Sequence, residues 1–197
     1  MSDWLALLFL SAALGDLALE YLLGISPLLA VTRKVEAARG LAAGVAVVAP
    51  LAVLASWLVT AQLLVPLGLT ALRLPVIVLV ITLLVQGLAA AVARLRPAWR
   101  EDICVFTPLL LINCVLLGTV LVSFELAGDT AGLLALALGL PLGYALLLVV
   151  FAHLRERLAA SDVPAPFAGA PIALISLAII AMALSGFSDR ANLLLGP

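Results

Sequence analysis

The sequence is poor in the residues on which most metal sites and disulfide scaffolds depend. Its 197 residues include two cysteines, Cys104 and Cys114, and one histidine. Neither cysteine has a C-x-x-C partner, so the chain leaves little room for a disulfide framework or a metal site made of its own side chains alone. It also lacks a P-loop and a G-x-G-x-x-G turn between a strand and a helix, so we expect it to bind no flavin or nucleotide.

Charge is scarce as well. Only 11% of the residues are charged, whereas soluble domains carry roughly 25%. The net charge of −1 provides no basic footprint for nucleic acid. In contrast, 66% of the residues are hydrophobic and the mean hydropathy is +1.34. A chain of this length could not hide so much apolar surface from water, so the composition predicts an all-α polytopic membrane protein.

The beginning of the chain contains no Lys or Arg before Arg33. It does contain Asp3, Asp16 and Glu20, so the basic region that opens a secretory signal peptide is missing. We therefore expect the first apolar segment to be retained as a membrane span.

Charge clusters and Pro/Gly clusters divide the chain into six apolar segments, each near the roughly 20 residues that a span needs. The segments lie at about 4–32, 41–60, 70–93, 103–123, 131–152 and 170–187. The sequence thus predicts six transmembrane helices in a single integral membrane domain over residues 1–197.

The basic residues predict the orientation, because Lys and Arg near membrane spans tend to remain cytoplasmic. They are concentrated after the first, third and fifth spans: Arg33, Lys34, Arg39, Arg94, Arg96, Arg100, Arg155 and Arg157. The opposite connections and ends hold only Arg73 and Arg190. We therefore expect both termini outside the cytoplasm.

Two similar octapeptides form a faint internal repeat. Residues 23–30 are Leu-Gly-Ile-Ser-Pro-Leu-Leu-Ala, and residues 111–118 are Leu-Ile-Asn-Cys-Val-Leu-Leu-Gly. Each octapeptide interrupts an apolar run with helix-breaking or polar residues, which lipid does not tolerate unless protein covers them. We therefore expect the first and fourth spans to be broken near the bilayer centre.

If six spans form two halves of three spans each, the second half has the opposite orientation in the membrane to the first, as in many transport proteins. The half-repeats would cover about 1–93 and 103–190. In such an inverted repeat Ser26 and Cys114 approach the bilayer centre from opposite sides.

Several short motifs stand out along the chain, most of all within residues 151–174. They are Arg155-Glu156-Arg157-Leu158, Asp162-Val163-Pro164-Ala165-Pro166-Phe167, Leu72-Arg73, Asn113-Cys114 with Gly118, and residues 31–36. These motifs resemble those of the A subunit of the Rnf complexes, which are ion-translocating ferredoxin:NAD oxidoreductases, and of the related small membrane subunits of sodium-pumping NADH:quinone reductases. The resemblance covers nearly the whole chain.

The resemblance implies an electron-transfer and ion-translocating role in the inner membrane of a bacterium. In the family, each half-repeat supplies one cysteine to an intramembrane [2Fe–2S] cluster, and a homologous six-helix partner of opposite topology supplies two more. Flavin, further Fe–S and NAD sites belong to other subunits. Carried onto this chain, the cluster ligand of the second repeat is Cys114, and Gly24, Pro27, Asn113 and Gly118 surround the site.

The first repeat departs from the family, because Ser26 stands where a cysteine is expected. Thiolate is the usual ligand of Fe–S clusters. Ser26 could bind as an alkoxide, another group could supply the fourth ligand, or the site could be altered or empty. Cys104 precedes Cys114 by ten residues, about 15 Å along a continuous helix, so we interpret it as a small buried hydrophobe.

Asp16 and Glu20 stand four residues apart, on one face of the first span. Carboxylates within a membrane are costly and mark ion pathways or charge pairs, so the two residues are candidates for an ion or proton site. The alternative is that they lie at the outer interface or pair with a neighbouring subunit. The inverted repeat alone would also permit a stand-alone small transporter or a purely structural membrane scaffold.

Overall fold

The computed structural model describes residues 25–32, 34–95, 107–111, 113–126, 130–161, 164–167 and 169–195. These residues form helices and short connections, with no strand among them. Four helical stretches in these ranges are long and apolar enough to cross a membrane: Val35–Leu64, Arg73–Arg94, Thr107–Glu125 and Gly132–Ala159. The prediction of an all-helical, multi-pass membrane protein is therefore confirmed, while most of the expected first span lies outside the described residues.

In the first half of the chain, the earliest described helix is the short α3 (Ile25–Val31), which is followed by the long helix α4 (Val35–Val59). Helix α4 starts earlier than the expected 41–60, because its charged first turn holds Glu36, which the positive end of a helix dipole favours. Pro50 lies inside α4 without ending it. The helix runs into a π-helical turn, η1 (Thr60–Leu64).

A tight turn reverses the chain between α4 and the next long helix. Gly68 adopts a φ of 67°, in the left-handed region that a side chain disfavours. A 3₁₀ turn, η2 (Thr70–Leu72), then leads into α5 (Arg73–Leu95). Helix α5 coincides closely with the expected span at 70–93.

The second half contains α7 (Cys114–Leu126), α8 (Thr130–Ala159) and α9 (Ala170–Leu195), with a 3₁₀ turn, η4 (Ala165–Phe167), before α9. Helix α8 continues seven residues beyond the expected end at 152, because its last turns hold basic side chains that suit a helix C-terminus. Helix α9 likewise extends beyond the expected end at 187, because an apolar run predicts the part of a helix that lies in lipid and not its polar ends.

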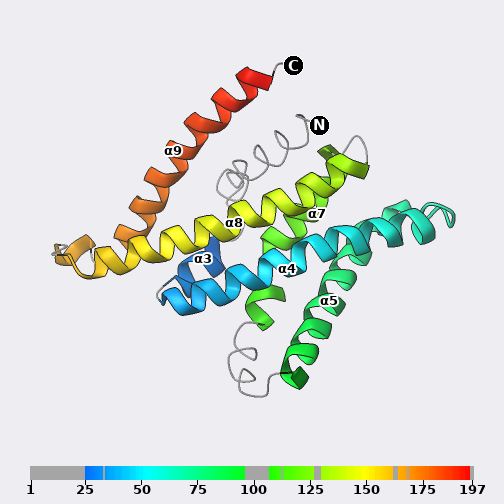
Figure 1. Ribbon diagram of the computed structural model, residues 1–197, viewed down its shortest axis with the longest axis horizontal. Helices are drawn as coiled ribbons and strands as arrows, with labels where there is room; N and C mark the ends of the chain where they lie inside the picture. The colour runs from blue at the N-terminus through cyan, green and yellow to red at the C-terminus, as the bar shows by residue number, and fades with distance from the viewer. Residues whose placement is uncertain are drawn as a thin grey trace.

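Helices α4 and α8 form the centre of the fold. They lie side by side and run in opposite directions (Figure 1), and α7 packs against both. The largest fully buried side chains of α8 are Tyr144, Leu148 and Phe151. The most apolar window of α8 is 67% buried, whereas that of α5 is only 17% buried. Helix α5 is therefore peripheral and presents its apolar side chains outward, where lipid or a partner protein can cover them.

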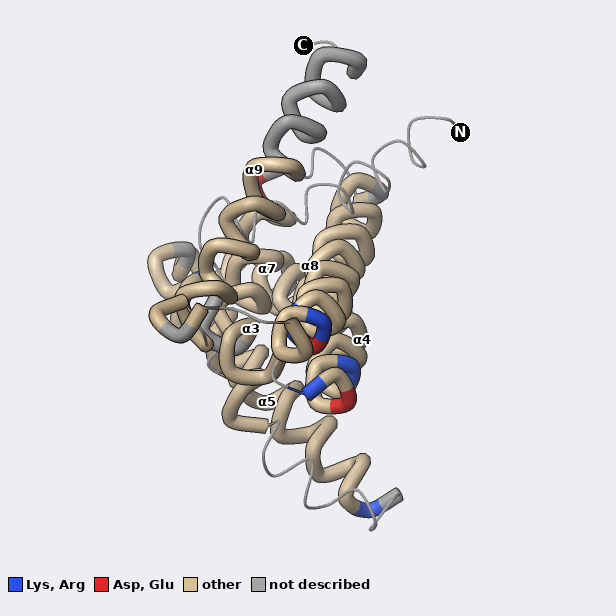
Figure 2. Tube along the Cα trace, turned by 90° about the vertical axis from the view of Figure 1, so that its left-hand side faces the viewer, with Lys and Arg blue, Asp and Glu red and all other residues tan. Residues whose placement is uncertain are grey.

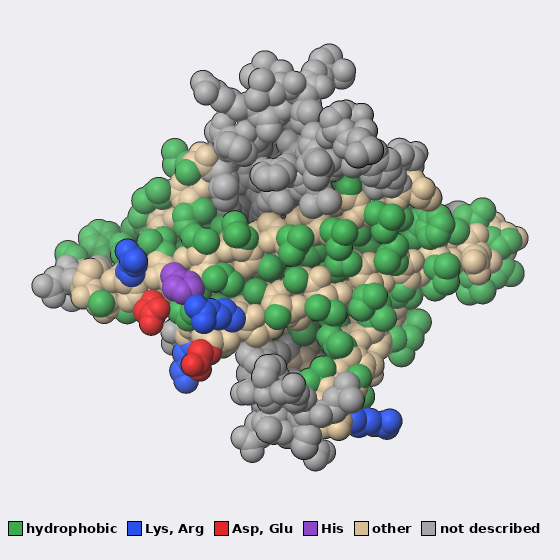
Figure 3. All heavy atoms as spheres, viewed as in Figure 1, with side chains coloured by type: hydrophobic (Ala, Val, Ile, Leu, Met, Phe, Trp, Pro, Cys, Tyr) green, Lys and Arg blue, Asp and Glu red, His purple; other side chains and the backbone are tan. Residues whose placement is uncertain are grey.

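A group of charged residues lies where α4 begins and α8 ends, whereas a basic residue in the last turn of α5 lies apart from it (Figure 2). Figure 3 shows the same group on a face that is otherwise mostly apolar. Of the three basic segments that we expected on the cytoplasmic side of the membrane, the one near Lys34 and the one near Arg155 therefore lie together. Outward-facing leucines such as Leu79 and Leu83 cover much of α5.

Candidate functional site

The candidate site centres on an interruption of the helical backbone at Asn113. Residues 107–111 are helical, Asn113 is not, and α7 begins at Cys114. The Val115 amide donates a hydrogen bond of 3.1 Å to Asn113 Oδ1, and the Leu116 amide donates one of 3.1 Å to the Asn113 carbonyl. Asn113 is therefore the N-cap of α7, a role that asparagine fills well because its side chain satisfies a free amide.

Asn113 is almost fully buried, with 3% of its surface exposed. Its side chain also faces Tyr144 of α8, although Nδ2 has no hydrogen-bond partner of good geometry among the described residues. The buried side chain of Asn113 restricts the position of the start of α7. A shift of this helix end would break the hydrogen bond between Asn113 Oδ1 and the Val115 amide and leave both groups unpaired in an apolar core.

Cys114 is the first residue of α7, and its side chain is exposed. It is the only cysteine in the described part of the chain. Gly118 lies one turn later on α7 and is half-buried. The interruption thus brings Asn113, Cys114 and Gly118 into one short stretch, as the octapeptide indicated.

The matching stretch of the first repeat is only partly described. Ser26 and Pro27 belong to the first turn of α3. Gly24, Asp16, Glu20 and Cys104 lie outside the described residues. Helix α3 packs against α4, and α7 packs against α4 as well. Ser26 and Cys114 therefore belong to two helices that share α4 as a neighbour.

The described residues do not form a metal site of their own. No group of three or more His, Cys, Asp or Glu side chains gathers anywhere in this part of the chain. A cluster with four protein ligands would therefore need donors from elsewhere. Cys114 is the one cysteine that the described residues could contribute to such a site.

Arg155 joins the end of α8 to the end of α3, a contact that the sequence did not reveal. Its Nη1 donates hydrogen bonds of 2.8 Å to the Leu29 carbonyl and 2.9 Å to Thr32 Oγ1. The Thr32 hydroxyl in turn donates a hydrogen bond of 2.6 Å to the Leu28 carbonyl. Arg155 thus binds groups at the C-terminal end of α3, where a cation is favourable.

A second contact joins α4 to α8 nearby. Arg39 Nη2 lies 3.4 Å from His153 Nε2, and His153 Nδ1 lies 2.8 Å from the Val149 carbonyl. Both side chains are exposed. Glu36 and Glu125 are also exposed near helix ends, where a charged side chain can reach water.

At the start of α5, Arg73 stacks on Phe124 of α7, with 4.4 Å between the guanidinium carbon and the ring centroid. Such a cation–π contact stabilises the packing of α5 on α7 by roughly 0.5–2 kcal/mol. Arg73 and Arg94 lie at opposite ends of α5. This placement agrees with the expectation that the two residues lie on opposite sides of the membrane.

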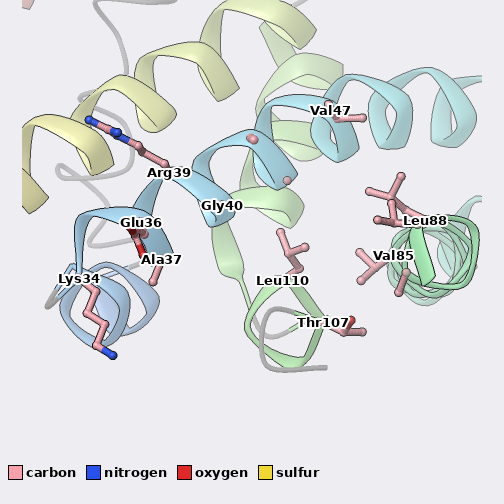
Figure 4. Close-up of a pocket in the computed structure, with 14 residues that line it drawn as sticks. Lys34, Glu36, Ala37, Arg39, Gly40, Val47, Val85, Leu88, Thr107 and Leu110 are labelled. Atoms are coloured by element: carbon pink, nitrogen blue, oxygen red, sulfur yellow. The ribbon is translucent and has the colours of Figure 1, made fainter. Parts of the chain in front are cut away.

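A cavity of about 790 Å³ lies between α4, α5 and residues 107–110. Small and apolar side chains make up most of its wall, including Gly40, Val85, Leu88 and Leu110 (Figure 4). Lys34 and Arg39 line its edge, but their side chains point away from it, Arg39 toward α8. The cavity therefore offers no cluster of ligands for redox chemistry.

The chain is similar to known membrane subunits over almost its full length. Residues 5–189 match the family described as Rnf-Nqr subunit, membrane protein. In Cereibacter sphaeroides, the A subunit of the ion-translocating oxidoreductase complex is 39% identical over 191 residues, which cover 97% of this chain and 99% of that protein. The protein of the same description from Actinobacillus pleuropneumoniae is 37% identical over 193 residues, covering 98% and 100%. That of Edwardsiella ictaluri is 37% identical over 188 residues, covering 95% and 97%.

Identity at this level over nearly the whole length of both chains accompanies a shared fold. The motifs at the start of α7, at the start of α5 and at the end of α8 fall within the matched residues. The chain therefore belongs to the Rnf-Nqr family of membrane subunits.

Proposed function

We propose that this chain serves as the A-type membrane subunit of an ion-translocating oxidoreductase complex. In that complex it helps to carry electrons across the membrane and couples their transfer to ion movement. The observation that carries the proposal is the placement of Cys114, which is exposed at the first residue of α7 and held there by the buried cap Asn113. The similarity to oxidoreductase subunits over 97% of the chain supports the same role.

We assign Cys114 as a ligand of a [2Fe–2S] cluster that this chain shares with a homologous six-helix partner of opposite topology. When bound, the cluster would supply one-electron transfer. The N-terminal end of α7 suits the negative charge that a thiolate ligand carries. The exposure of Cys114 leaves room for a partner to approach. Other subunits of the complex carry the flavin, further Fe–S and NAD sites.

Ser26 occupies the equivalent position of the first repeat, and we assign it as the second ligand from this chain. An alcohol binds iron less readily than a thiol does, so this assignment predicts an altered reduction potential. Replacing Ser26 with Cys should change the spectrum and potential of the cluster, and Ser26→Ala should weaken the site. If both variants behave like the unmodified protein, Ser26 is not a ligand.

The arrangement of α4 and α8 supports a 3+3 inverted repeat. The two helices correspond to the second span of each half, and they pack along each other in opposite directions. Each follows a short helix that carries one of the candidate ligands, Ser26 on α3 and Cys114 on α7. Motion of one half against the other would expose a central site to alternate sides of the membrane.

We further propose that the protein resides in the bacterial cytoplasmic membrane with both termini in the periplasm. The basic residues at the start of α4 and the end of α8 lie together (Figure 2), which supports a common cytoplasmic side for two of the three basic segments. Asp16 and Glu20 are candidates for an ion pathway in the first span. Periplasmic labelling of a tag at each terminus tests the orientation, and a label that reaches neither terminus would contradict it.

The functional test uses the whole complex in inverted membrane vesicles. Ferredoxin-dependent reduction of NAD and the uptake of Na⁺ and protons are measured for the unmodified protein, Cys114→Ala and the control Cys104→Ala. We expect Cys114→Ala to abolish both activities and Cys104→Ala to retain them. Transport by the isolated chain without redox partners would instead identify a stand-alone transporter.

A further inference from the structure

The last turn of α3 is held from outside by a side chain far away in the sequence. Arg155, on α8, donates to the Leu29 carbonyl and to Thr32 Oγ1, across 126 and 123 positions of the chain. Arg155 is half-buried, and Thr32 is only 1% exposed. A guanidinium that enters such a place keeps its charge and needs acceptors, which the free carbonyls at a helix end provide.

The acceptors form a small closed network. The Thr32 hydroxyl donates to the Leu28 carbonyl at 2.6 Å while it accepts from Arg155 at 2.9 Å. The Thr32 amide also donates to the Leu28 carbonyl, at 3.3 Å. Arg155 therefore fixes both the backbone at Leu29 and the side chain at Thr32. Charge-assisted hydrogen bonds of this kind are stronger than neutral ones.

Helix α3 is too short to be stable by itself. It is seven residues long, and helices shorter than about 12 residues are marginal on their own. Its residues Leu28 and Val31 belong to the buried core, and the helix packs against α4. The Arg155 contact adds a link from its C-terminal end to α8, whose apolar window is the most buried among the four candidate spans of the described residues.

The same short helix carries Ser26, three residues before Leu29. At a rise of 1.5 Å per residue, Leu29 and Thr32 lie about 5 and 9 Å from Ser26 along the helix axis. The half-buried guanidinium of Arg155 binds both residues, so its charge lies on the order of 10 Å from position 26 and acts there with partial screening by water.

We propose that Arg155 is a positioning residue of the electron-transfer site: it fastens α3 to α8, sets the place of position 26, and favours the reduced state of the site by its charge. The part that concerns reduction rests on the proposed function, whereas the fastening of α3 does not. The proposal also gives a physical reason for the first arginine of the Arg-Glu-Arg-Leu motif at the end of α8.

Arg157 provides a matched control. It lies two residues further along α8, carries the same charge, and is exposed. Arg157→Gln therefore changes the net charge as Arg155→Gln does without removing the contact to α3. Arg155→Lys keeps the charge but replaces the planar fork of donors by a compact ammonium group.

The first measurement is hydrogen–deuterium exchange of the assembled complex, read from peptides that cover residues 25–32. We expect exchange to be on the order of tenfold faster in Arg155→Gln, because opening α3 no longer breaks charge-assisted bonds. Arg157→Gln should exchange like the unmodified protein. Equal rates in Arg155→Gln and the unmodified protein, or equal acceleration in both Gln variants, would overturn the fastening of α3. If Arg155→Gln does not assemble, Arg155→Lys should show faster exchange, and unchanged exchange in it would overturn the proposal.

The second measurement is a redox titration of the cluster by electron paramagnetic resonance. We expect a lower reduction potential in Arg155→Gln than in Arg155→Lys, since only the Gln variant removes the positive charge. A wild-type complex without a cluster signal would refute the proposed function and leave the exchange result standing. A cluster whose potential is the same in both variants would refute the effect of the charge alone.

Discussion

Replacing Asn113 with Ala should loosen the start of α7, where Cys114 lies. The substitution removes the Oδ1 atom that accepts the 3.1 Å hydrogen bond from the Val115 amide. Val115 is 5% exposed, so water cannot readily replace the lost acceptor. Loss of an Asn cap costs about 0.5–2 kcal/mol, and an unsatisfied buried amide costs roughly 1–3 kcal/mol. These two figures describe the same lost bond, so we expect a destabilisation of about 1–2 kcal/mol.

The assay is the thermal unfolding of the detergent-solubilised complex, followed by size-exclusion chromatography with a fluorescent fusion to this chain. A loss of this size should lower the unfolding midpoint by roughly 2–8 °C for a chain of this length. Asn113→Ser is the matched control, because serine caps helices as well as asparagine does. Both variants remove the amide that faces Tyr144, so the difference between them isolates the cap. If Asn113→Ala is as stable as Asn113→Ser, the capping argument is refuted.

Two further pairs of substitutions are compared in the same unfolding assay. Gly44→Leu, on α4, should destabilise by about 1–3 kcal/mol, because a Cβ at Gly44 would already lie 3.2 Å from Leu110 Cδ1, whereas Gly87→Leu should be nearly neutral because nothing lies within 4 Å of that Cβ. Equal unfolding midpoints for these two variants would contradict the close packing of α4 against Leu110. Phe151→Ala should lower the free energy of unfolding by about 3–5 kcal/mol, because Phe151 is fully buried. Val150→Ala should lower it far less, because Val150 is 52% exposed. A smaller destabilisation by Phe151→Ala than by Val150→Ala would show that α8 is not the centre of the core.

The apolar runs predicted the long helices well, because a membrane helix needs a continuous hydrophobic stretch of known length. They missed the helix ends. Helix α4 begins at Val35 and α8 ends at Ala159, well outside the apolar windows. Charged residues can continue a helix beyond the lipid, where their side chains reach water.

The octapeptides indicated where the site residues lie in the chain, and the structure places Asn113 and Cys114 together at a helix start. The contact of Arg155 with Leu29 could not be predicted from one sequence. It joins residues 126 positions apart, and no local pattern specifies which helix end a guanidinium will reach. The motif that contains Arg155 pointed to a family resemblance, but it did not indicate which residues Arg155 contacts.

The central claim is that Cys114 binds a [2Fe–2S] cluster shared with a partner subunit. The most direct measurement is low-temperature electron paramagnetic resonance of the purified, reduced complex, comparing the unmodified protein with Cys114→Ala and Cys104→Ala. Subunits that carry their own Fe–S centres contribute the same background to each spectrum, so the difference spectra report this site alone. We predict that one [2Fe–2S] signal disappears in Cys114→Ala and remains in Cys104→Ala. A spectrum that is unchanged in Cys114→Ala would contradict the account.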